Sequence, residues 1–227
     1  MAPCQEHPLA YVTMVRMRVD HVVYAAEHDG LQATADRLGK LIGVKPVYGG
    51  VHPRFGTRNV ILPLAHERYV EVVEVLEHPA ADKAPFGQVV RARSEAGGGW
   101  LGWVVRVDDI SEVETRLGRQ AVDGNRHRPD GTELRWRQVG VRGLQADPQL
   151  PFFIQWAPGI PHPSEDASTG VTIESLTIAG DPERVRDWLG LPADRTSTVI
   201  DFKWVAPHGT PGLMSVTFDT PQGEVTI

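Results

Sequence analysis

The sequence predicts an α+β protein of repeated βαβββ units, whose mainly antiparallel sheets pair into a cup with the helices on its outer face. Three observations predict this class. A strand, a helix and several further strands recur along the chain. The first strands of successive repeats are about 80 and about 70 residues apart, which is too far for a solenoid. Each helix is apolar on one side only, so it covers one face of a sheet and leaves the other face free.

The first repeat begins with the buried strand RVDHVVYAA, residues 18–26. The helix LQATADRLGKLIG follows, with its leucines and isoleucine on one side and Gly43 as a stop signal. Pro53 and Gly56 predict a turn between the next two strands. We expect the three strands after the helix near residues 45–50, 58–64 and 69–76.

The second repeat begins with WLGWVVRVDD, residues 100–109. Ser111 and Glu114 have the spacing of a capping box at a helix start, and Gly118 predicts the end of that helix. The segment PDG predicts a turn further along. We expect the strands of this repeat near residues 125–128, 134–141 and 151–156.

The third repeat is shorter and begins with VTIESLTIAG, residues 171–180. Asp181 is typical of a helix N-cap, Pro182 of the first helical position and Gly190 of the residue after a helix. We expect its strands near residues 198–204, 213–219 and 224–227.

These repeats divide the chain into four parts. Residues 1–14 show no periodicity, and we expect a flexible N-terminal arm. Residues 15–157 hold the two units that we expect to pair. Residues 158–168, PGIPHPSEDAS, are rich in proline and serine and predict a linker. Residues 169–227 form the third, shorter unit.

Composition excludes several classes of function. The net charge of −6 provides no basic surface for nucleic acid, and no apolar run approaches the roughly 18 residues of a membrane span. The N-terminal segment lacks the apolar core of a signal peptide, so we expect a cytoplasmic protein. Cys4 is the only cysteine, which excludes an intrachain disulfide. One local basic stretch, which includes Arg126, Arg135 and Arg137, fits either a small anion or a solvated face.

Five segments occur in an order that resembles the vicinal oxygen chelate superfamily, and within it the glyoxalase-like branch. They are DHVVYAA, GVHPRFGTRNVILPL, RYVEVVEV, RPDGTELRWR and LPFFIQW, the last followed by HP. Together they lie within residues 18–163. The resemblance implies that two βαβββ units pair into one cup. It also implies a divalent metal there, with one ligand from the first strand and one from the last strand of each unit.

The resemblance places two metal ligands in the first unit, His21 and Glu71. Strand alternation agrees, because each is the one ionisable side chain on an otherwise apolar or aromatic strand face. Burying a carboxylate in this way is costly unless it is paired or binds a metal. A histidine and a glutamate suit zinc, iron, manganese or nickel. The alternative is a buried hydrogen bond between His21 and Glu71.

The second unit departs from the family pattern. Its first-strand position falls on Gly102, which has no side chain to offer, and its last-strand position falls on Gln155. The expected metal set is therefore His21, Glu71 and Gln155, with water in an open coordination position. The alternative for Gln155 is a core amide without a ligand role.

Four further residues are candidates for binding a substrate in the cup. Asn59 offers both a donor and an acceptor at the start of a strand, and its neighbour Arg58 could hold a carboxylate. Trp136 and Arg137 alternate in LRWRQV, and the arginine face could bind an anionic or enolate-like oxygen. The alternatives are an asparagine that holds a turn and arginines that lie in solvent.

The sequence thus predicts a glyoxalase-like small-molecule enzyme of the vicinal oxygen chelate type. A divalent ion would polarise a carbonyl and stabilise an enolate or another oxyanion, with lyase, isomerase and oxygenase chemistry all open. His52 and His162, both expected in loops, could supply a general base, but the sequence assigns no catalytic residue. The alternatives are a metal-free protein that binds or sequesters a small molecule, and an interaction module that uses the third unit. A homodimer is compatible with each of them.

Overall fold

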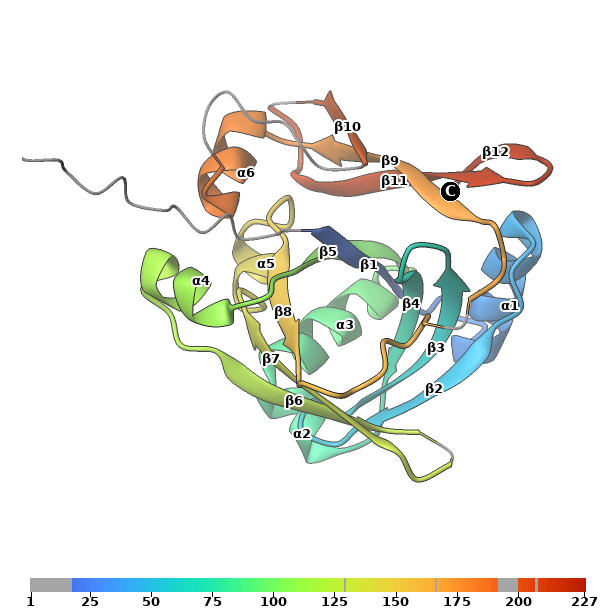
Figure 1. Cartoon of the computed structure of the whole chain (residues 1–227), viewed down its shortest axis with the longest axis horizontal. Helices are drawn as coiled ribbons and strands as arrows, with labels where there is room; N and C mark the ends of the chain where they lie inside the picture. The colour runs from blue at the N-terminus through green and yellow to red at the C-terminus, as the bar shows by residue number, and fades with distance from the viewer. Residues whose placement is uncertain (1–17, 129, 166, 192–199, 207) are drawn as a thin grey trace, which may run out of the picture.

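The computed structural model describes residues 18–128, 130–165, 167–191, 200–206 and 208–227. The arm expected at residues 1–14 lies outside this part of the chain. The predicted α+β class is confirmed, because two βαβββ units pair through their curled sheets. The sheets join along both edges, so the expected cup is a closed barrel (Figure 1).

Eight strands close the barrel. In order around it they are β1 (Arg18–Ala25), β4 (Arg68–Val75), β3 (Thr57–Leu64), β2 (Val47–His52), β6 (Val122–His127), β7 (Glu133–Val139), β8 (Phe152–Trp156) and β5 (Gly99–Arg106). In each unit the first strand pairs in parallel with the last, β1 with β4 and β5 with β8. The units meet where β1 runs antiparallel to β5 and where β2 contacts β6. Alternate side chains of every strand therefore point into one interior.

Two helices cover the outside of the barrel, as the sequence predicts. They are α1 (Leu31–Ile42) and α4 (Ile110–Leu117). The expected capping box at the start of α4 does not form. Asp109 caps this helix by accepting a hydrogen bond from the backbone N–H of Ser111, while Glu114 accepts one from the backbone N–H of Ala121. The acidic residue just before the helix satisfies the free N–H group instead.

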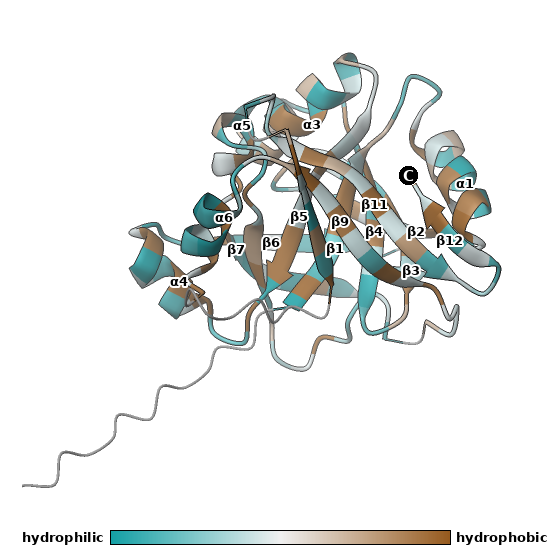
Figure 2. Ribbon diagram, turned by 90° about the horizontal axis from the view of Figure 1, so that it is seen from above, coloured by the Kyte–Doolittle hydropathy of each residue, from teal (hydrophilic) through white to brown (hydrophobic). Residues whose placement is uncertain are grey.

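Three further helices were not predicted from the sequence. They are α2 (Pro79–Lys83), α3 (Pro85–Glu95) and α5 (Gly143–Ala146). From α3, Phe86, Val89 and Val90 join an apolar cluster with the inward side chains of the barrel strands. Leu144 of α5 joins the same cluster. Figures 1 and 2 together place α3 across one end of the barrel, so its apolar side chains close the interior from that end.

The third unit has the expected order of elements and a different sheet. It consists of β9 (Thr172–Ala179), α6 (Pro182–Leu189), β10 (Asp201–Val205), β11 (Gly212–Thr220) and β12 (Gly223–Thr226). Its strands lie in the order β10-β9-β11-β12, and the first strand pairs in parallel with the second rather than with the last. This unit therefore does not repeat the topology of the two barrel units.

The sheet of the third unit lies against the outside of the barrel over β1 and β5 (Figures 1 and 2). Val216 and Phe218 of β11 share one buried apolar cluster with Trp103 of β5. Phe202 of β10 also packs on Trp103, with ring centroids 5.2 Å apart. The third unit and the barrel thus bury a common core. No helix in the described ranges has the length and apolar character needed to cross a membrane.

Candidate functional site

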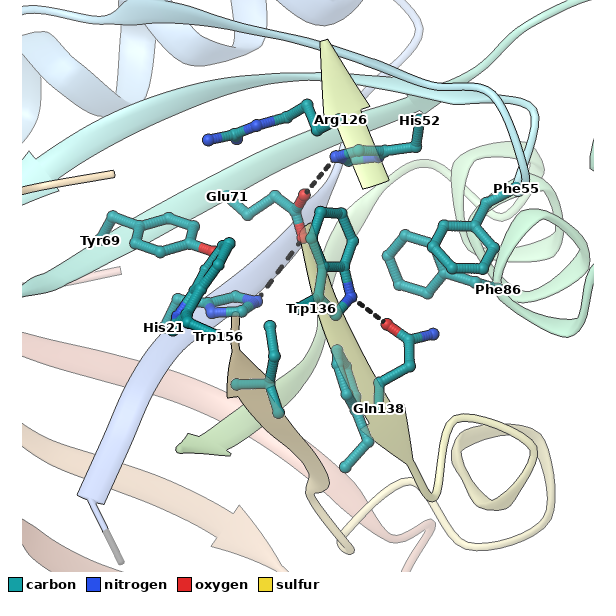
Figure 3. A pocket seen from close by; sticks show the side chains of 12 residues that line it. His21, His52, Phe55, Tyr69, Glu71, Phe86, Arg126, Trp136, Gln138 and Trp156 are labelled. Atoms are coloured by element: carbon teal, nitrogen blue, oxygen red, sulfur yellow. Dashed lines mark hydrogen bonds and ion pairs between the residues drawn. The ribbon is translucent and has the colours of Figure 1, made fainter. Parts of the chain in front are cut away.

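A small cavity lies inside the barrel and is lined by both units (Figure 3). Its volume is about 30 Å³, which is space for about two water-sized groups. Its walls are formed by the side chains of His21, His52, Phe55, Tyr69, Glu71, Phe86, Arg126, Trp136, Gln138, Phe152, Ile154 and Trp156. The charged and imidazole groups gather on one side, while Gln138 lies among the aromatic and aliphatic groups that form the rest (Figure 3). A mainly apolar wall with a few polar groups is the usual composition of a small-molecule site.

Glu71 of β4 is the central polar group of the cavity. Its carboxylate is buried, and Oε1 accepts a hydrogen bond of 2.6 Å from Asn59 Nδ2. Oε2 accepts no hydrogen bond from the described residues and lies 3.8 Å from His21 Nε2. On the other side, His52 Nε2 lies 3.8 Å from Oε1 (Figure 3). One carboxylate oxygen is therefore fixed, and the other faces the cavity.

His21 of β1 is oriented by a second buried carboxylate. Its Nδ1 lies 2.7 Å from Asp20 Oδ1, and its ring stacks on Tyr69 with centroids 4.3 Å apart. Burial alone would raise the pKa of Asp20, but the contacts with His162 and His21 outweigh it and hold that pKa well below its ordinary value. An ionised Asp20 can only accept hydrogen bonds, so His21 carries a proton on Nδ1 and turns Nε2 toward Glu71.

His52 lies at the end of β2, not in a loop as the sequence predicts. Thr57 Oγ1 lies 2.9 Å from its Nδ1, across the hairpin that joins β2 to β3. Complete burial lowers the pKa of His52 well below its ordinary value, and the positive charge of Arg126 lowers it further. His52 is therefore a neutral imidazole. No clear signal for this lay in the sequence, because Gly49 and Gly50 interrupt the strand pattern just before Val51 and His52.

Arg126 of β6 is the cation of the cavity. Its side chain is buried, and its Nη1 donates a hydrogen bond of 3.3 Å to Asn59 Oδ1. Burial lowers the pKa of Arg126, whereas Tyr69 and Glu71 nearby raise it, and an arginine remains protonated in either case. Asn59 thus joins Arg126 to Glu71. The sequence placed Arg126 in a local basic stretch without distinguishing it from its exposed neighbours.

Two of the candidate substrate-binding residues lie at the cavity and two do not. Asn59 and Trp136 point inward, and Trp136 donates a hydrogen bond of 2.7 Å to Gln138 Oε1. Arg58 and Arg137 lie on the outer face of the barrel, where Arg58 pairs with Glu74 and Arg137 with Glu114. Alternation correctly separated Trp136 from Arg137, and the structure shows that the arginine side is the outer one.

Gln155 is not brought together with His21 and Glu71. It lies on the outer face of β8, where its Nε2 donates to the carbonyl oxygen of Asp108 and its Oε1 accepts from the backbone N–H of Ile110. The inward side chains of β8 are Phe152, Ile154 and Trp156. The side chain of Gln155 therefore fixes the start of α4 to the barrel and does not reach the cavity.

Gly102 faces the interior, and an apolar side chain occupies the space beside it. A Cβ atom placed on Gly102 would lie 2.9 Å from Leu144 Cδ2 of α5. His162, the other candidate base, does not line the cavity. It lies behind His21, with its Nε2 3.3 Å from Asp20 Oδ2 and its ring 5.7 Å from that of Tyr69.

The donor set of the cavity forms half of a metal site. His21 Nε2 and Glu71 Oε2, 3.8 Å apart, could both reach one ion at metal–ligand distances of about 2.1 Å. Asp20 on Nδ1 of His21 is the kind of outer partner that histidine ligands have. However, the described residues contain no group of three or more His, Cys, Asp or Glu side chains arranged to hold a metal. The residues present therefore do not complete a metal site.

A second, larger hollow lies on the outer side of Trp136 and Trp156. It has a volume of about 590 Å³ and is lined from β6, β7 and the end of β8. Trp136 and Trp156 line both this groove and the cavity. The two indole rings, with centroids 5.5 Å apart, therefore separate the cavity from the groove.

Comparisons with known proteins agree with the fold. The family model described as a glyoxalase-like domain matches residues 19–191. A crystal structure of a hypothetical protein from Staphylococcus aureus is 18% identical, with a TM-score of 0.66 and coverage of 92% of this chain and 93% of that chain. Methylmalonyl-CoA epimerase from Mycobacterium tuberculosis is 14% identical, with a TM-score of 0.43 over 67% of this chain and 95% of that chain. A Streptomyces coelicolor methylmalonyl-CoA epimerase variant in complex with 2-nitronate-propionyl-CoA is 15% identical, with a TM-score of 0.42 over 63% and 98%. No curated protein matches the chain.

Proposed function

The chain belongs to the glyoxalase-like domain family of the vicinal oxygen chelate superfamily, and on that premise we propose that it is a small-molecule enzyme that moves a proton at a carbon next to a carbonyl group. Glu71 is the base. The observation that carries this proposal is the position of its carboxylate. Asn59 holds Oε1, while Oε2 faces the cavity without a hydrogen bond from the described residues. A buried carboxylate with one committed and one open oxygen is suited to proton abstraction.

The step that Glu71 performs is a simple proton transfer. Oε2 takes the proton from the substrate carbon, and the electron pair of that C–H bond moves to the carbonyl oxygen to form an enolate. Return of the proton to the same or the neighbouring carbon gives an epimerase or an isomerase. Loss of a leaving group from the next carbon gives a lyase. Neither route needs an oxidant or a reductant.

His52 is placed to stabilise the enolate oxygen. Burial keeps its imidazole neutral by lowering its pKa. When Nδ1 accepts a hydrogen bond from the Thr57 hydroxyl, the proton of the ring is on Nε2 and faces the cavity beside Glu71. A neutral imidazole N–H in a water-poor site can donate to an oxygen that becomes negative during the reaction.

The superfamily resemblance offers a divalent ion at His21 and Glu71 as an alternative. We derive no step from such an ion, because the donor set of the described residues is incomplete and Arg126 adds a positive charge to the same cavity. Elemental analysis of the purified protein tests this alternative. A stoichiometric metal that is lost in both His21→Ala and Glu71→Ala would support a metal-dependent reaction instead.

Deuterium exchange tests the proposed reaction without knowledge of the natural product. The protein is incubated in D₂O with small 2-oxo acids, hydroxyketones and 1,3-dicarbonyl compounds, and loss of the C–H signal is followed by proton NMR. We expect exchange of one compound class to fall by at least about 100-fold in Glu71→Gln, the lower limit for loss of a general base. Glu74→Gln is the matched control, because Glu74 is on the same strand but pairs with Arg58 on the outer face.

Two results would contradict the proposal. Exchange that persists in Glu71→Gln would remove the assigned base. Binding of a compound without any exchange would favour a metal-free binding protein on this scaffold. The aromatic walls of the cavity, where Phe55 and Phe86 have ring centroids 6.0 Å apart, make that second function the natural alternative.

A further inference from the structure

We propose that Arg126 is the anchor for a carboxylate, so that the molecule bound in the cavity is a small carboxylic acid in its anionic form. This inference rests on the proposed function for its catalytic meaning, because it narrows the substrate class to carbonyl compounds that also carry a carboxylate. The binding of the anion itself can be measured without any reaction.

The first observation is the unsatisfied edge of the Arg126 guanidinium. Only 2% of the residue is exposed. Nη1 is used by Asn59, but Nε and Nη2 have no hydrogen-bond partner among the described residues. A buried donor without a partner costs about 1–3 kcal/mol, and more when it is charged. Such a group in a native structure calls for a partner, and the described part of the chain does not provide one.

The two free groups are the right pair for one ligand. Nε–H and Nη2–H point along the same edge of the planar guanidinium, with a spacing that matches the two oxygens of a carboxylate. Nη1, on the other edge, is the group that already has a protein partner. One whole edge of the guanidinium is therefore without a partner among the described residues. Both of its nitrogen atoms are closed off from water, so an anion reaches them from the cavity only when a neighbouring side chain moves aside.

The second observation is the backbone that makes room for Arg126. A Cβ atom on Gly49 of β2 would lie 2.8 Å from Arg126 Nη1 and 2.1 Å from Asn59 Oδ1. A Cβ atom on Gly50 would lie 3.2 Å from Arg126 Cγ and 1.9 Å from the carbonyl oxygen of His127. Both glycines weaken a strand. The pair Gly49–Gly50 therefore serves to seat Arg126 and Asn59 under β2.

The size of the cavity limits the ligand. About 30 Å³ is space for about two water-sized groups, so the cavity as it stands admits the carboxylate head of a molecule and not the rest of it. Arg126 and Glu71 line the same cavity, so a carboxylate held in it by Arg126 lies beside the proposed base. A carbonyl carbon next to that carboxylate would then be near the proposed base.

The experiment uses formate and its neutral isostere formamide as probes, with binding to the full chain measured by saturation-transfer NMR on the single carbon-bound proton. We expect formate to give a saturable binding curve, and formamide to have a Kd at least about tenfold higher. The reason is that a charge-assisted hydrogen bond is worth about 1.5–3 kcal/mol. Arg126→Met should weaken formate by a similar factor. Arg126→Lys should weaken it less, since it retains the charge and loses the fork.

Arg135→Met is the matched control. It removes an arginine from the neighbouring strand β7 on the outer face, where the Arg135 side chain is 66% exposed. Formate binding should be unchanged in this variant. If Arg126→Met does not fold, as judged by its thermal transition, the comparison of formate with formamide in the parent protein and the result for Arg126→Lys decide the question.

The outcomes separate the anchor from the base. Equal binding of formate and formamide, no saturation by formate, or unchanged formate binding in Arg126→Met would overturn the anchor. None of these results would affect the assignment of Glu71 as the base, because that assignment is tested separately by the loss of deuterium exchange in Glu71→Gln. Formate binding that persists in Glu71→Gln while exchange is lost would support both assignments together, and retained exchange in that variant would contradict the base alone.

Discussion

Two buried carboxylates inside the protein have different surroundings, and the difference separates a structural role from a chemical one. Both oxygens of Asp20 are engaged, Oδ1 with His21 Nδ1 at 2.7 Å and Oδ2 with Trp156 Nε1 at 3.2 Å. The charged or polar nitrogens of Arg106 and His162 also lie 3.3 Å from Oδ2. Among the residues that the structure describes, a donor reaches only one oxygen of Glu71. A buried carboxylate with hydrogen bonds on both oxygens fixes its neighbours in place, whereas an open acceptor is available to a ligand. We therefore assign the orientation of His21 to Asp20 and the chemistry to Glu71.

Because His52 is buried, the free energy of unfolding depends on pH. The pKa of His52 is far below the ordinary value of 6.5 in the folded state, whereas the unfolded chain has the ordinary value. Above pH 6.5 the His52 side chain is neutral in both the folded and the unfolded state, so it adds no pH dependence to the free energy of unfolding. Below that pH the unfolded state binds a proton that the folded state does not, so the free energy of unfolding falls by up to about 1.4 kcal/mol per pH unit.

Urea unfolding between pH 7.5 and 5.5 measures this effect. We expect His52→Gln to be less stable at pH 7.5, because the hydrogen bond to Thr57 is disturbed, but to lose less stability than the parent as the pH falls. His28→Gln is the control, since His28 is an exposed histidine on the same unit. Parallel pH profiles for the parent and His52→Gln would show that His52 is not held neutral by the fold.

Alternation along strands predicted which residues share a face, and it could not predict which face is inside. It grouped His21 with its apolar neighbours and separated Trp136 from Arg137, and the structure agrees with both groupings. Gln155 was assigned by family position, one residue away from the inward Ile154 and Trp156. A shift of one residue along a strand reverses the face, so such an assignment needs the register, which depends on partners far away in sequence.

At the scale of elements, β2 and α3 shape the cavity most directly. β2 provides the two glycines above Arg126 and ends at His52. α3 fills the remaining interior with Phe86, whose ring lies 6.2 Å from that of Phe152. The sequence did not predict α3, because PFGQVVRARSE combines a glycine, two prolines nearby and few apolar residues, and so gives a weak helical period. Its place at the end of the barrel follows from tertiary packing.

Gly49→Ala tests whether Arg126 and Asn59 need the space that Gly49 leaves beside β2. The added methyl group would collide with Asn59 Oδ1 and Arg126 Nη1, both in a packed interior, so we expect a loss of about 1–3 kcal/mol in the free energy of unfolding. Formate binding should weaken as well, because Arg126 must move. Gly143→Ala is the control, since its nearest neighbour would be Arg119 Nη1 at 3.8 Å. Unaltered stability and formate binding in Gly49→Ala would mean that Arg126 and Asn59 can move aside without cost.

At the scale of the whole molecule, the sequence predicted the count and order of the units but not the way that the third one folds. Its βαβββ order agrees with the prediction, yet the sheet order β10-β9-β11-β12 differs from that of the barrel units. The order of elements does not fix which strands pair, because pairing depends on which apolar faces meet. The Staphylococcus aureus structure aligns over 92% of this chain, so its likeness extends beyond the barrel.

The shared core predicts that the barrel and the third unit unfold together. Phe218 of β11 is fully buried in the cluster that contains Trp103 of β5, and Trp100 Nε1 donates a hydrogen bond of 2.8 Å to the carbonyl oxygen of Ile227. Phe218→Ala should therefore cost about 3–5 kcal/mol. Hydrogen exchange followed by mass spectrometry should show the amides of β1 and β9 losing protection by the same factor, because one global opening exposes both. Faster exchange confined to β9, with β1 unchanged, would mean that the third unit opens on its own and that the barrel does not depend on it.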